Sequence, residues 1–357
     1  QIDIEMSFGD EDTIFAVVED LMQNIFKETK NYTLEDHFVR VPWAECMRRF
    51  GTDKPDMRFG NEIQDITAVF ENTEFQVFKN TIENGGIINC VKFENAADKY
   101  SRKGLDQLQD FVKHGFKAKA LAYLKMENDV LTGSIAKVLS EEEKAKLVEK
   151  LALVNNDLVL VIADSARIVQ ASLGALRVRL GHELNLIPSE ATYKFLWVTD
   201  FPMFEYSEED QRWVAAHHPF TAPKEEDVDK LFTDPGHVSS RAYDLVLNGY
   251  ELLSGSIRIH SQELQAKVFE AIGLSLEDAK ARFGFFLDSF RYGTPPHGGV
   301  GIGLERLIMV LAGTDNIRDV VAFPTTNSSF DLMSEAPNVV DKKQLDILGI
   351  EISKQEK

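Results

Sequence analysis

The dipeptide Asn248-Gly249 restricts the fold more than any other feature of this sequence. It lies between two apolar runs, and Asn-Gly in that setting predicts the two-residue turn of a β-hairpin. Such a turn fixes the register of the strands, so that Leu247 pairs with Tyr250 and Val246 with Glu251. The chain is therefore predicted to contain an antiparallel sheet.

Apolar periodicity predicts further strands and helices around this hairpin. Expected strands span residues 1–8, 74–78, 86–93, 119–125, 158–163, 195–199, 242–247 and 250–260. Expected helices span 14–26, 42–50, 168–180, 262–272 and 276–286, and a Gly/Pro-rich loop at 292–303 leads into a final apolar helix. Ser101, and the capping-box pair Ser140 and Glu143, begin two more helices. This mixture predicts an α+β fold, with residues 57–186 as a self-contained module.

The composition excludes several classes of protein. With 44% hydrophobic and 27% charged residues, the chain is typical of soluble proteins, and no apolar run approaches the roughly 20 residues of a membrane helix. Its 357 residues favour more than one domain. Cys46 and Cys90 lack metal-like spacing, which favours a reduced, cytoplasmic setting. A net charge of −19 argues against concentrated nucleic-acid contact, although a basic patch can exist on an acidic protein.

The first residues alternate polar and apolar, which predicts a strand with one buried face. Gln1, Asp3 and Glu5 share the polar face, and two carboxylates with an amide can bind an ammonium group or a metal ion. A solvated face of an antiparallel strand explains the same pattern. Because the pattern starts at the first residue, without an initiator methionine or a leader, we expect the chain to begin inside a sheet, as a fragment or processed product would.

The hairpin register places Asp244 diagonally opposite Glu251 on one face. Two converging acids repel unless a cation lies between them, and oxygen ligands suit Mg²⁺ that is bound partly through water and substrate phosphates. Strict alternation would turn Arg258 to the other face, and a bulge at Gly255 can correct this. Arg258 is then suited to bidentate binding of a carboxylate. A surface hairpin with scattered charges is the alternative.

Two further segments contain residues suited to ligand binding. His217 and His218 suit either a loop that contacts substrate or a structural pair. The glycines of residues 298–303 lead into a helix, where the backbone can approach a ligand closely and the helix N-terminus favours phosphate. Arg306 in the first turn opposes the helix dipole, which indicates a specific anionic or aromatic partner.

In their order along the chain, these segments resemble the class II aminoacyl-tRNA synthetases of the aspartyl type. Gln1-Ile2-Asp3-Ile4-Glu5 is similar to the second strand of motif 2 of that family, and Gly303-Leu304-Glu305-Arg306 to motif 3. Residues 248–260 resemble the strand pair between these motifs. Closer similarity to the bacterial members of the family is found in residues 51–56, 217–220 and 292–297.

The resemblance implies ligation of L-aspartate to tRNA(Asp) with ATP and Mg²⁺. Asp3 would bind the ammonium group of aspartate and Arg258 its side-chain carboxylate, while His217 would close over the substrate. The remaining implied site residues are Gln1 and His218 for aspartate, Glu5 as a lining residue, Asp244 and Glu251 for Mg²⁺, and Glu251, Gly303, Leu304, Glu305 and Arg306 for ATP.

The resemblance also implies a domain order. Residues 1–56 and 187–341 would form the two parts of a catalytic domain, an antiparallel sheet flanked by helices, with a tail at 342–357. Residues 57–186 would be an inserted GAD-like domain, similar to one in a subunit of tRNA-dependent amidotransferases. Full-length family members are homodimers that also carry an anticodon-binding barrel, motif 1 and the first half of motif 2. We therefore expect this chain alone to be an incomplete site that forms adenylate poorly.

Two alternatives remain open. An asparaginyl- or lysyl-type synthetase of the same subclass is disfavoured by the inserted module and by Arg258, because lysine has no side-chain carboxylate. The second alternative is a non-catalytic fragment or paralogue that binds tRNA or protein. The paralogue is disfavoured by the joint presence of Asp3, Asp244, Glu251, Arg258 and Arg306, while the truncation leaves this alternative open for the chain itself.

Overall fold

A six-stranded sheet forms the framework around which residues 2–302 fold. The structure is a computed structural model that describes residues 1–353. The strands lie in the order β1 (Ile2–Ser7), β13 (His297–Ile302), β12 (Tyr250–Ile257), β11 (Ala242–Leu247), β8 (Phe195–Thr199) and β2 (Val39–Pro42). Neighbouring strands run antiparallel except for β2, which pairs with β8 in parallel. The predicted antiparallel sheet is confirmed.

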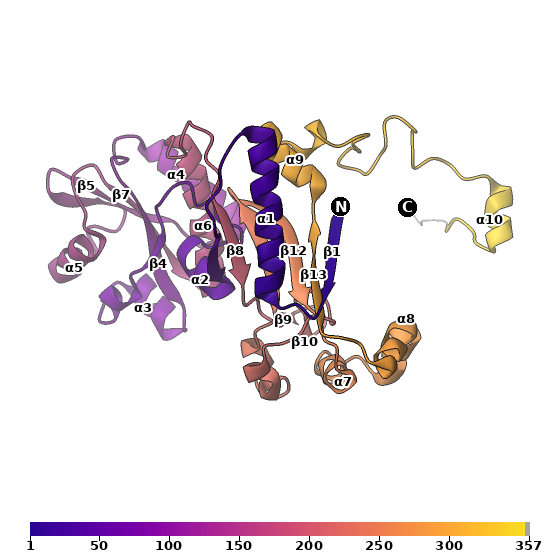
Figure 1. Cartoon of the computed structure of the whole chain (residues 1–357). Helices are drawn as coiled ribbons and strands as arrows, with labels where there is room; N and C mark the ends of the chain where they lie inside the picture. The colour runs from indigo at the N-terminus through magenta and orange to yellow at the C-terminus, as the bar shows by residue number, and fades with distance from the viewer. Residues whose placement is uncertain (354–357) are drawn as a thin grey trace. The chain divides into compact units, whose positions relative to one another are not determined.

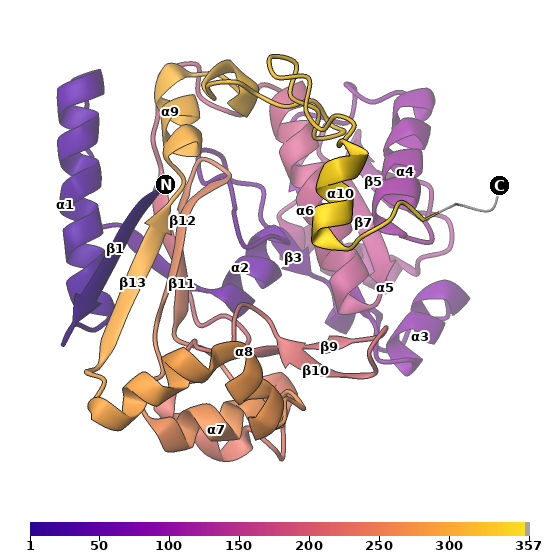
Figure 2. The ribbon, with the colours of Figure 1, turned by 90° about the vertical axis from the view of Figure 1, so that its right-hand side faces the viewer.

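Helix α1 (Glu11–Lys30) covers one face of this sheet (Figures 1 and 2). Its buried stripe includes Phe15, whose ring stacks on Trp197 with centroids 4.0 Å apart and meets Tyr243 edge-on at 5.0 Å. Glu19 lies within the same apolar layer and accepts a hydrogen bond from Trp197 Nε1 at 2.9 Å. Because aromatic stacking and a satisfied buried carboxylate both fix this layer, α1 determines which face of the sheet is closed to solvent.

Apolar side chains cover the opposite face at its β8–β2 end. There Leu196, Val198 and Val246 pack against Cys46 of α2 (Trp43–Phe50). Between β12 and β13 the chain forms α7 (Gln262–Ala271), α8 (Leu276–Ser289) and the short helix η4 (Phe290–Tyr292). The hairpin β9 (Phe204–Ser207) and β10 (Arg212–Ala215) follows β8, with η2 (Glu225–Lys230) and η3 (Pro235–His237) before β11.

A second, five-stranded sheet is built from residues between α2 and β8. Its order is β3 (Ile63–Asp65), β4 (Ile87–Phe93), β7 (Leu158–Asp164), β5 (Ala122–Glu127) and β6 (Val130–Gly133). Helices α4 (Arg102–Phe116) and α6 (Ala166–Glu183) pack on one face. The other face carries η1 (Thr67–Phe70), α3 (Gln76–Glu83) and α5 (Glu141–Leu151). We call this part the five-stranded module; its predicted limits, 57–186, stay a prediction.

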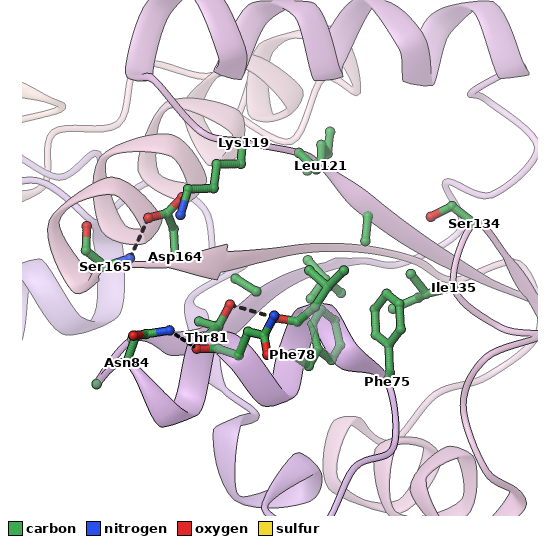
Figure 3. Close-up of a pocket in the computed structure, with 18 residues that line it drawn as sticks. Phe75, Phe78, Thr81, Asn84, Lys119, Leu121, Ser134, Ile135, Asp164 and Ser165 are labelled. Carbon is green, nitrogen blue, oxygen red and sulfur yellow. Dashed lines mark hydrogen bonds and ion pairs between the residues drawn. The ribbon is translucent and has the colours of Figure 1, made fainter.

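A pocket of about 710 Å³ lies beside α3 in the five-stranded module (Figure 3). Phe75 and Phe78 form part of its apolar wall. Two of its polar side chains are engaged locally, since the Thr81 hydroxyl donates to Val77 O and the Asn84 amide to Asn80 O. Asp164 also lines the pocket; its Oδ2 lies 3.9 Å from Lys119 Nζ and has no hydrogen-bond partner among residues 1–353.

Two predicted elements are wrong. Residues 74–78 were expected as a strand, but α3 begins at Gln76, and Phe75 and Phe78 pack together at helical spacing. The segment His297–Ile302, expected to be part of a loop, is the strand β13 in the middle of the six-stranded sheet. Its glycines reduce β-propensity, and pairing with strands on both sides compensates for it.

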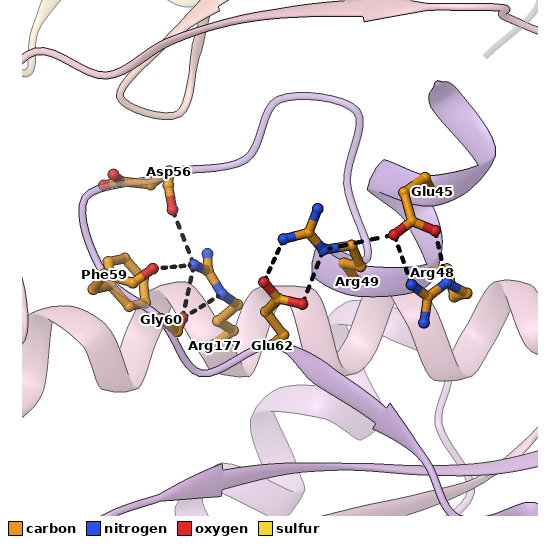
Figure 4. A network of polar contacts seen from close by, with 8 residues as sticks. All are labelled: Glu45, Arg48, Arg49, Asp56, Phe59, Gly60, Glu62 and Arg177. Carbon is orange, nitrogen blue, oxygen red and sulfur yellow. Dashed lines mark hydrogen bonds and ion pairs between the residues drawn. The ribbon is translucent and has the colours of Figure 1, made fainter. Parts of the chain in front are cut away.

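Arg177 of α6 ties the five-stranded module to the segment that precedes it (Figure 4). The side chain is fully buried, and its guanidinium donates to the carbonyl oxygens of Asp56, Phe59 and Gly60 at 2.7–3.1 Å. The Phe59 ring lies 4.1 Å from the guanidinium carbon. Burial lowers the pKa of Arg177 to about 10, so the group remains charged at neutral pH.

The second compact unit is formed by Gln1 and the residues from Gly303 onward. It contains α9 (Leu304–Ala312), η5 (Ile317–Asp319) and α10 (Lys342–Leu348). Gly303 is the N-cap residue of α9, and Gly313 ends the helix in the left-handed conformation. Across residues 1–353, no helix has both the length and the apolar character needed to cross a membrane.

Replacing Arg177 tests its role in the fold. We expect Arg177→Met to lower the free energy of unfolding by about 3 kcal/mol or more, because three carbonyl groups lose their donor and two of them, those of Asp56 and Phe59, are in buried residues. Arg179→Met is the matched control on the same helix, since Arg179 forms an exposed pair with Glu183 and should cost less than about 1 kcal/mol. Urea unfolding curves measure both; equal losses would contradict the assignment.

Candidate functional site

The hairpin that joins β11 and β12 determines which residues face a ligand. The predicted pairs are confirmed, with Leu247 opposite Tyr250 and Val246 opposite Glu251. The register then shifts, because Leu253, rather than Leu252, pairs with Leu245. This irregularity inserts Leu252 as an extra residue, so that Glu251 and the even-numbered residues beyond the shift lie on one face.

The predicted bulge at Gly255 is wrong in position. Gly255 pairs regularly with Tyr243, and the shift lies three residues earlier. Glycine is needed at 255 for packing, because a Cβ there would lie 2.1 Å from Gly299 O. The bulge still has the predicted effect, which is to bring Arg258 to the face of Asp244. Arg258 follows Ser254 and Ser256 at alternate positions, and Ser254 pairs with Asp244.

A row of polar positions crosses four strands on the face opposite α1. Asp3 of β1 pairs with Gly301 of β13, which pairs with Ser254 of β12, which pairs with Asp244 of β11. Side chains at paired positions of a sheet lie on one face. The predicted alternation of β1 is confirmed, because its polar side chains are exposed and its apolar ones partly buried.

A second row lies next to the first. It runs from Glu5 through Gly299 and Ser256 to Ala242. A Cβ at position 299 would lie 2.4 Å from Glu5 Oε2. Glycine at that position therefore leaves the space that the Glu5 carboxylate occupies.

Arg258 is held by three neighbours at the end of β12. Its Nη1 donates to Ser256 Oγ at 2.7 Å and to His218 Nε2 at 2.5 Å, while Nε lies 3.6 Å from Glu5 Oε1. Burial and the adjacent charge of Arg258 lower the pKa of His218 to about 4, so the ring is neutral at physiological pH. Nε2 of this ring faces Arg258 Nη1, while Nδ1 accepts from Phe220 N at 3.3 Å and lies 3.4 Å from Thr221 Oγ1.

His217 lies on the same segment but faces the acidic residues. Its ring packs against Phe201 with centroids 5.3 Å apart. Burial lowers the pKa of His217, and the negative charges of Glu251 and Asp53 oppose that shift. Helix α7 holds the same segment in place, because Gln265 Nε2 donates to Pro219 O at 2.7 Å.

Asp244 is the most buried acidic residue on the polar face of the six-stranded sheet. Its side chain is buried, and Oδ1 has no hydrogen-bond partner among residues 1–353. Burial raises the pKa of Asp244 to about 7, with Ser254 and Lys54 opposing the shift and Glu251 and Asp53 adding to it. An unpaired buried carboxylate beside a second carboxylate suits a cation.

Lys54 and Asp53 are neighbours that the sequence analysis did not assign to the site. Lys54 Nζ lies 3.9 Å from Glu251 Oε2 and 3.9 Å from Asp53 Oδ1. No group of three or more histidine, cysteine or carboxylate side chains within residues 1–353 is arranged to hold a metal. The unpartnered Oδ1 of Asp244, on the same face as Glu251, fits Mg²⁺ that takes its other oxygens from water and phosphates.

Seven of the predicted site residues lie on the polar face of the six-stranded sheet, and the others belong to the second unit. The polar face carries Asp3, Glu5, His217, His218, Asp244, Glu251 and Arg258. The remaining predicted residues belong to the second unit: Gln1, which is exposed, and Gly303, Leu304, Glu305 and Arg306 at the start of α9. Sequence reasoning missed Asp53 and Lys54, as well as Ser254 and Ser256.

Comparison with known proteins connects this arrangement to one family. Residues 1–327 match the family described as tRNA synthetases class II (D, K and N). The chain is 47% identical over 352 residues to an aspartate–tRNA ligase of Staphylococcus carnosus and 49% identical over 356 residues to one of Listeria welshimeri. These alignments cover 99% and 100% of this chain and 60% of each relative, so the chain spans about 60% of the length of the curated relatives.

A solved structure, the aspartyl tRNA synthetase from Entamoeba histolytica, is 17% identical in sequence. It aligns with 89% of this chain and 58% of its own, at a TM-score of 0.32.

Asp244→Asn tests the buried carboxyl group. Because its pKa in the fold, about 7, exceeds the ordinary 3.8, the folded protein binds this proton more tightly than the unfolded chain. Stability that is present below pH 4 is therefore lost as the pH rises through 7. Between pH 5 and pH 8 the wild type should lose about 2–3 kcal/mol of free energy of unfolding through this group, and Asp244→Asn should not lose it.

Urea unfolding at both pH values, with and without Mg²⁺, provides the readout. Mg²⁺ should stabilise the wild type at pH 8 and leave Asp244→Asn unchanged, because the variant lacks the anionic ligand. Asp110→Asn on the exposed side of α4 is the control and should follow the wild type. Identical pH profiles for wild type and Asp244→Asn would exclude a raised pKa at this position.

Proposed function

The chain belongs to the class II tRNA synthetases of the D, K and N group, and we propose that it forms part of a site that activates L-aspartate with ATP and transfers it to tRNA(Asp), a site that is incomplete in this chain alone. The relatives in Staphylococcus carnosus and Listeria welshimeri are aspartate–tRNA ligases. Because the chain spans about 60% of their length, the complete reaction is a proposal for this chain.

The observation that carries the proposal is the restrained guanidinium of Arg258 on the same face as Asp3. A guanidinium binds a carboxylate through two parallel hydrogen bonds, which suits the side chain of aspartate. Asp3 binds the ammonium group of the substrate. Ser256 and neutral His218 orient Arg258, and neither adds positive charge that would compete for the substrate carboxylate.

The chemistry needs orientation and charge neutralisation more than a protein nucleophile. An oxygen of the aspartate α-carboxylate attacks the α-phosphorus of ATP, and the bond to pyrophosphate breaks. The 3′-terminal ribose hydroxyl of the tRNA then attacks the acyl carbon, and AMP leaves. Mg²⁺, held by Asp244 and Glu251, would neutralise phosphate charge. His217, between Phe201 and the acidic residues, covers the bound aspartate.

The second unit provides the proposed ATP contacts. Gly303 at the N-cap of α9 lets the nucleotide pack close to the backbone, and Arg306 in the first turn binds its ring and phosphates. Leu304 and Glu305 complete this segment. We also propose the domain order that the resemblance implies. Residues 57–186 form an inserted domain of the GAD-like type, residues 1–56 and 187–341 form the two parts of a catalytic domain, and residues 342–357 form a tail.

The cellular setting and assembly follow from the same proposal. Cys46 and Cys90 are both free and buried, and burial raises the pKa of each to about 12. Inert buried thiols are typical of a reduced, cytoplasmic protein. The full-length enzyme is proposed to be a homodimer, as implied by the family resemblance.

Amino-acid-dependent exchange of pyrophosphate into ATP tests this function. We expect exchange with L-aspartate and none with L-asparagine or L-lysine, because Arg258 requires a side-chain carboxylate. Arg258→Ala should lower kcat/KM for aspartate by about 100-fold or more, since a charge-assisted bidentate contact is lost. Arg179→Ala, on the surface of α6, is the control that should leave exchange unchanged.

The assay is run with this chain and with the full-length product of the gene that encodes it. This chain alone should exchange poorly, and a normal rate from it would contradict the incomplete-site prediction. Exchange with asparagine or lysine would move the assignment within the family. Absence of exchange from both proteins would exclude the ligase activity and favour a binding module.

A further inference from the structure

Residues 51–60, which we call the strap, lie between the five-stranded module and the polar face of the six-stranded sheet. At the sheet, Lys54 Nζ is 3.9 Å from Glu251 Oε2, and its charge acts on the buried Asp244 carboxyl. Asp53 is close enough for its charge to act on both Asp244 and His217. The strap thus brings an ammonium group to the carboxylates proposed to hold Mg²⁺.

The other side of the strap is fixed to α6. Gly51 adopts φ +68°, and a Cβ there would lie 2.0 Å from Gln170 O. A Cβ on Gly174 would lie 2.6 Å from Phe50 O, so glycine is needed on both sides of this contact. Arg177 then donates to the carbonyl groups at the far end of the strap, including that of Asp56 (Figure 4).

The strap is also stiffened from within. The Asp56 carboxylate pairs with Arg58, with Nη2 and Oδ2 2.6 Å apart, and it accepts from Arg58 N at 3.0 Å. Lys54 is therefore a half-exposed cation on a segment that is held by α6 and by the Asp56–Arg58 ion pair.

Binding of a divalent cation would change the charges around Lys54. A divalent ion between Asp244 and Glu251 would repel the Lys54 ammonium and compete with it for Glu251. The unpartnered Asp244 Oδ1 is the group that such an ion would satisfy. Lys54 would then keep Asp53, 3.9 Å away, as its counter-charge, and a phosphate oxygen on the same ion supplies a second one in place of Glu251.

We propose that Lys54 binds a phosphate of the Mg²⁺-bound nucleotide, and that α6 of the five-stranded module holds it in place through Arg177. This inference rests on the proposed function and extends it, because it gives the module a part in nucleotide binding. Arg177 is a positioning residue, since it acts only through the strap.

Calorimetric titration with Mg²⁺-pyrophosphate tests the contact at Lys54. Lys54→Met should weaken binding about tenfold or more, because one charge-assisted contact to phosphate is lost. Lys54→Arg should retain most of the affinity. Lys194→Met, which removes an ion pair with Glu35, is the control and should bind as the wild type does.

Titration with Mg²⁺ alone separates phosphate binding from simple charge balance. If Lys54 served only as a counter-ion of Glu251, Lys54→Met would bind Mg²⁺ more tightly than the wild type and would bind Mg²⁺-pyrophosphate with unchanged affinity. That result would overturn the inference. The same titrations with Arg177→Lys test positioning. That variant keeps the charge but not the three-carbonyl geometry, and it should weaken pyrophosphate binding while its circular dichroism stays native.

Failure of this inference is distinct from failure of the proposed function. In exchange assays, Lys54→Met and Arg177→Lys should raise KM for ATP about tenfold and leave KM for aspartate unchanged. An unchanged KM for ATP in both variants, with normal aspartate-dependent exchange in the wild type, would refute the inference alone. No exchange in the wild type would refute the proposed function, while the pyrophosphate titrations would still decide whether Lys54 binds phosphate.

Discussion

The register shift at Leu252 decides what the six-stranded sheet presents to a ligand. Without it, Glu251 would alternate away from Ser254 and Ser256, and Arg258 would point toward α1, where Trp197 and Phe15 fill the space. A guanidinium in that layer would lose its solvation without gaining an acceptor. One extra residue in a strand therefore places a cation and the acidic pair on a common face.

The division of the sheet into two faces gives each charged group its environment. On the α1 side, stacked aromatic rings exclude water, and the buried Glu19 is satisfied by Trp197. On the other side, Asp244 is buried without a full set of partners, whereas Asp3 and Glu5 remain exposed. A buried acid with a raised pKa next to exposed acids is the arrangement expected where a cation and a charged substrate bind.

Much of the fold was predictable because local signals agreed with tertiary packing. The Asn248-Gly249 turn fixed the hairpin pairs, and Ser140 with Glu143 forms the predicted capping box. The glycines of β13 were predicted as loop, because a single sequence does not reveal that Glu5 needs the space above Gly299.

The site was predictable only in part, for a related reason. Asp3, Asp244, Glu251 and Arg258 could be found from strand alternation and family resemblance, since both depend on local spacing. Lys54 could not, because its position depends on α6, more than 100 residues later in the chain. The bulge was placed at Gly255, since glycine is a common bulge signal, whereas Gly255 serves a close approach to Gly299.

A crystal structure with a non-hydrolysable sulfamoyl analogue of aspartyl-adenylate tests the central claim most directly. The account predicts the aspartyl carboxylate paired with Arg258 and the ammonium group at Asp3, on the face opposite α1. An analogue bound at the α3 pocket or elsewhere, with Arg258 still paired only with His218, Ser256 and Glu5, would contradict it.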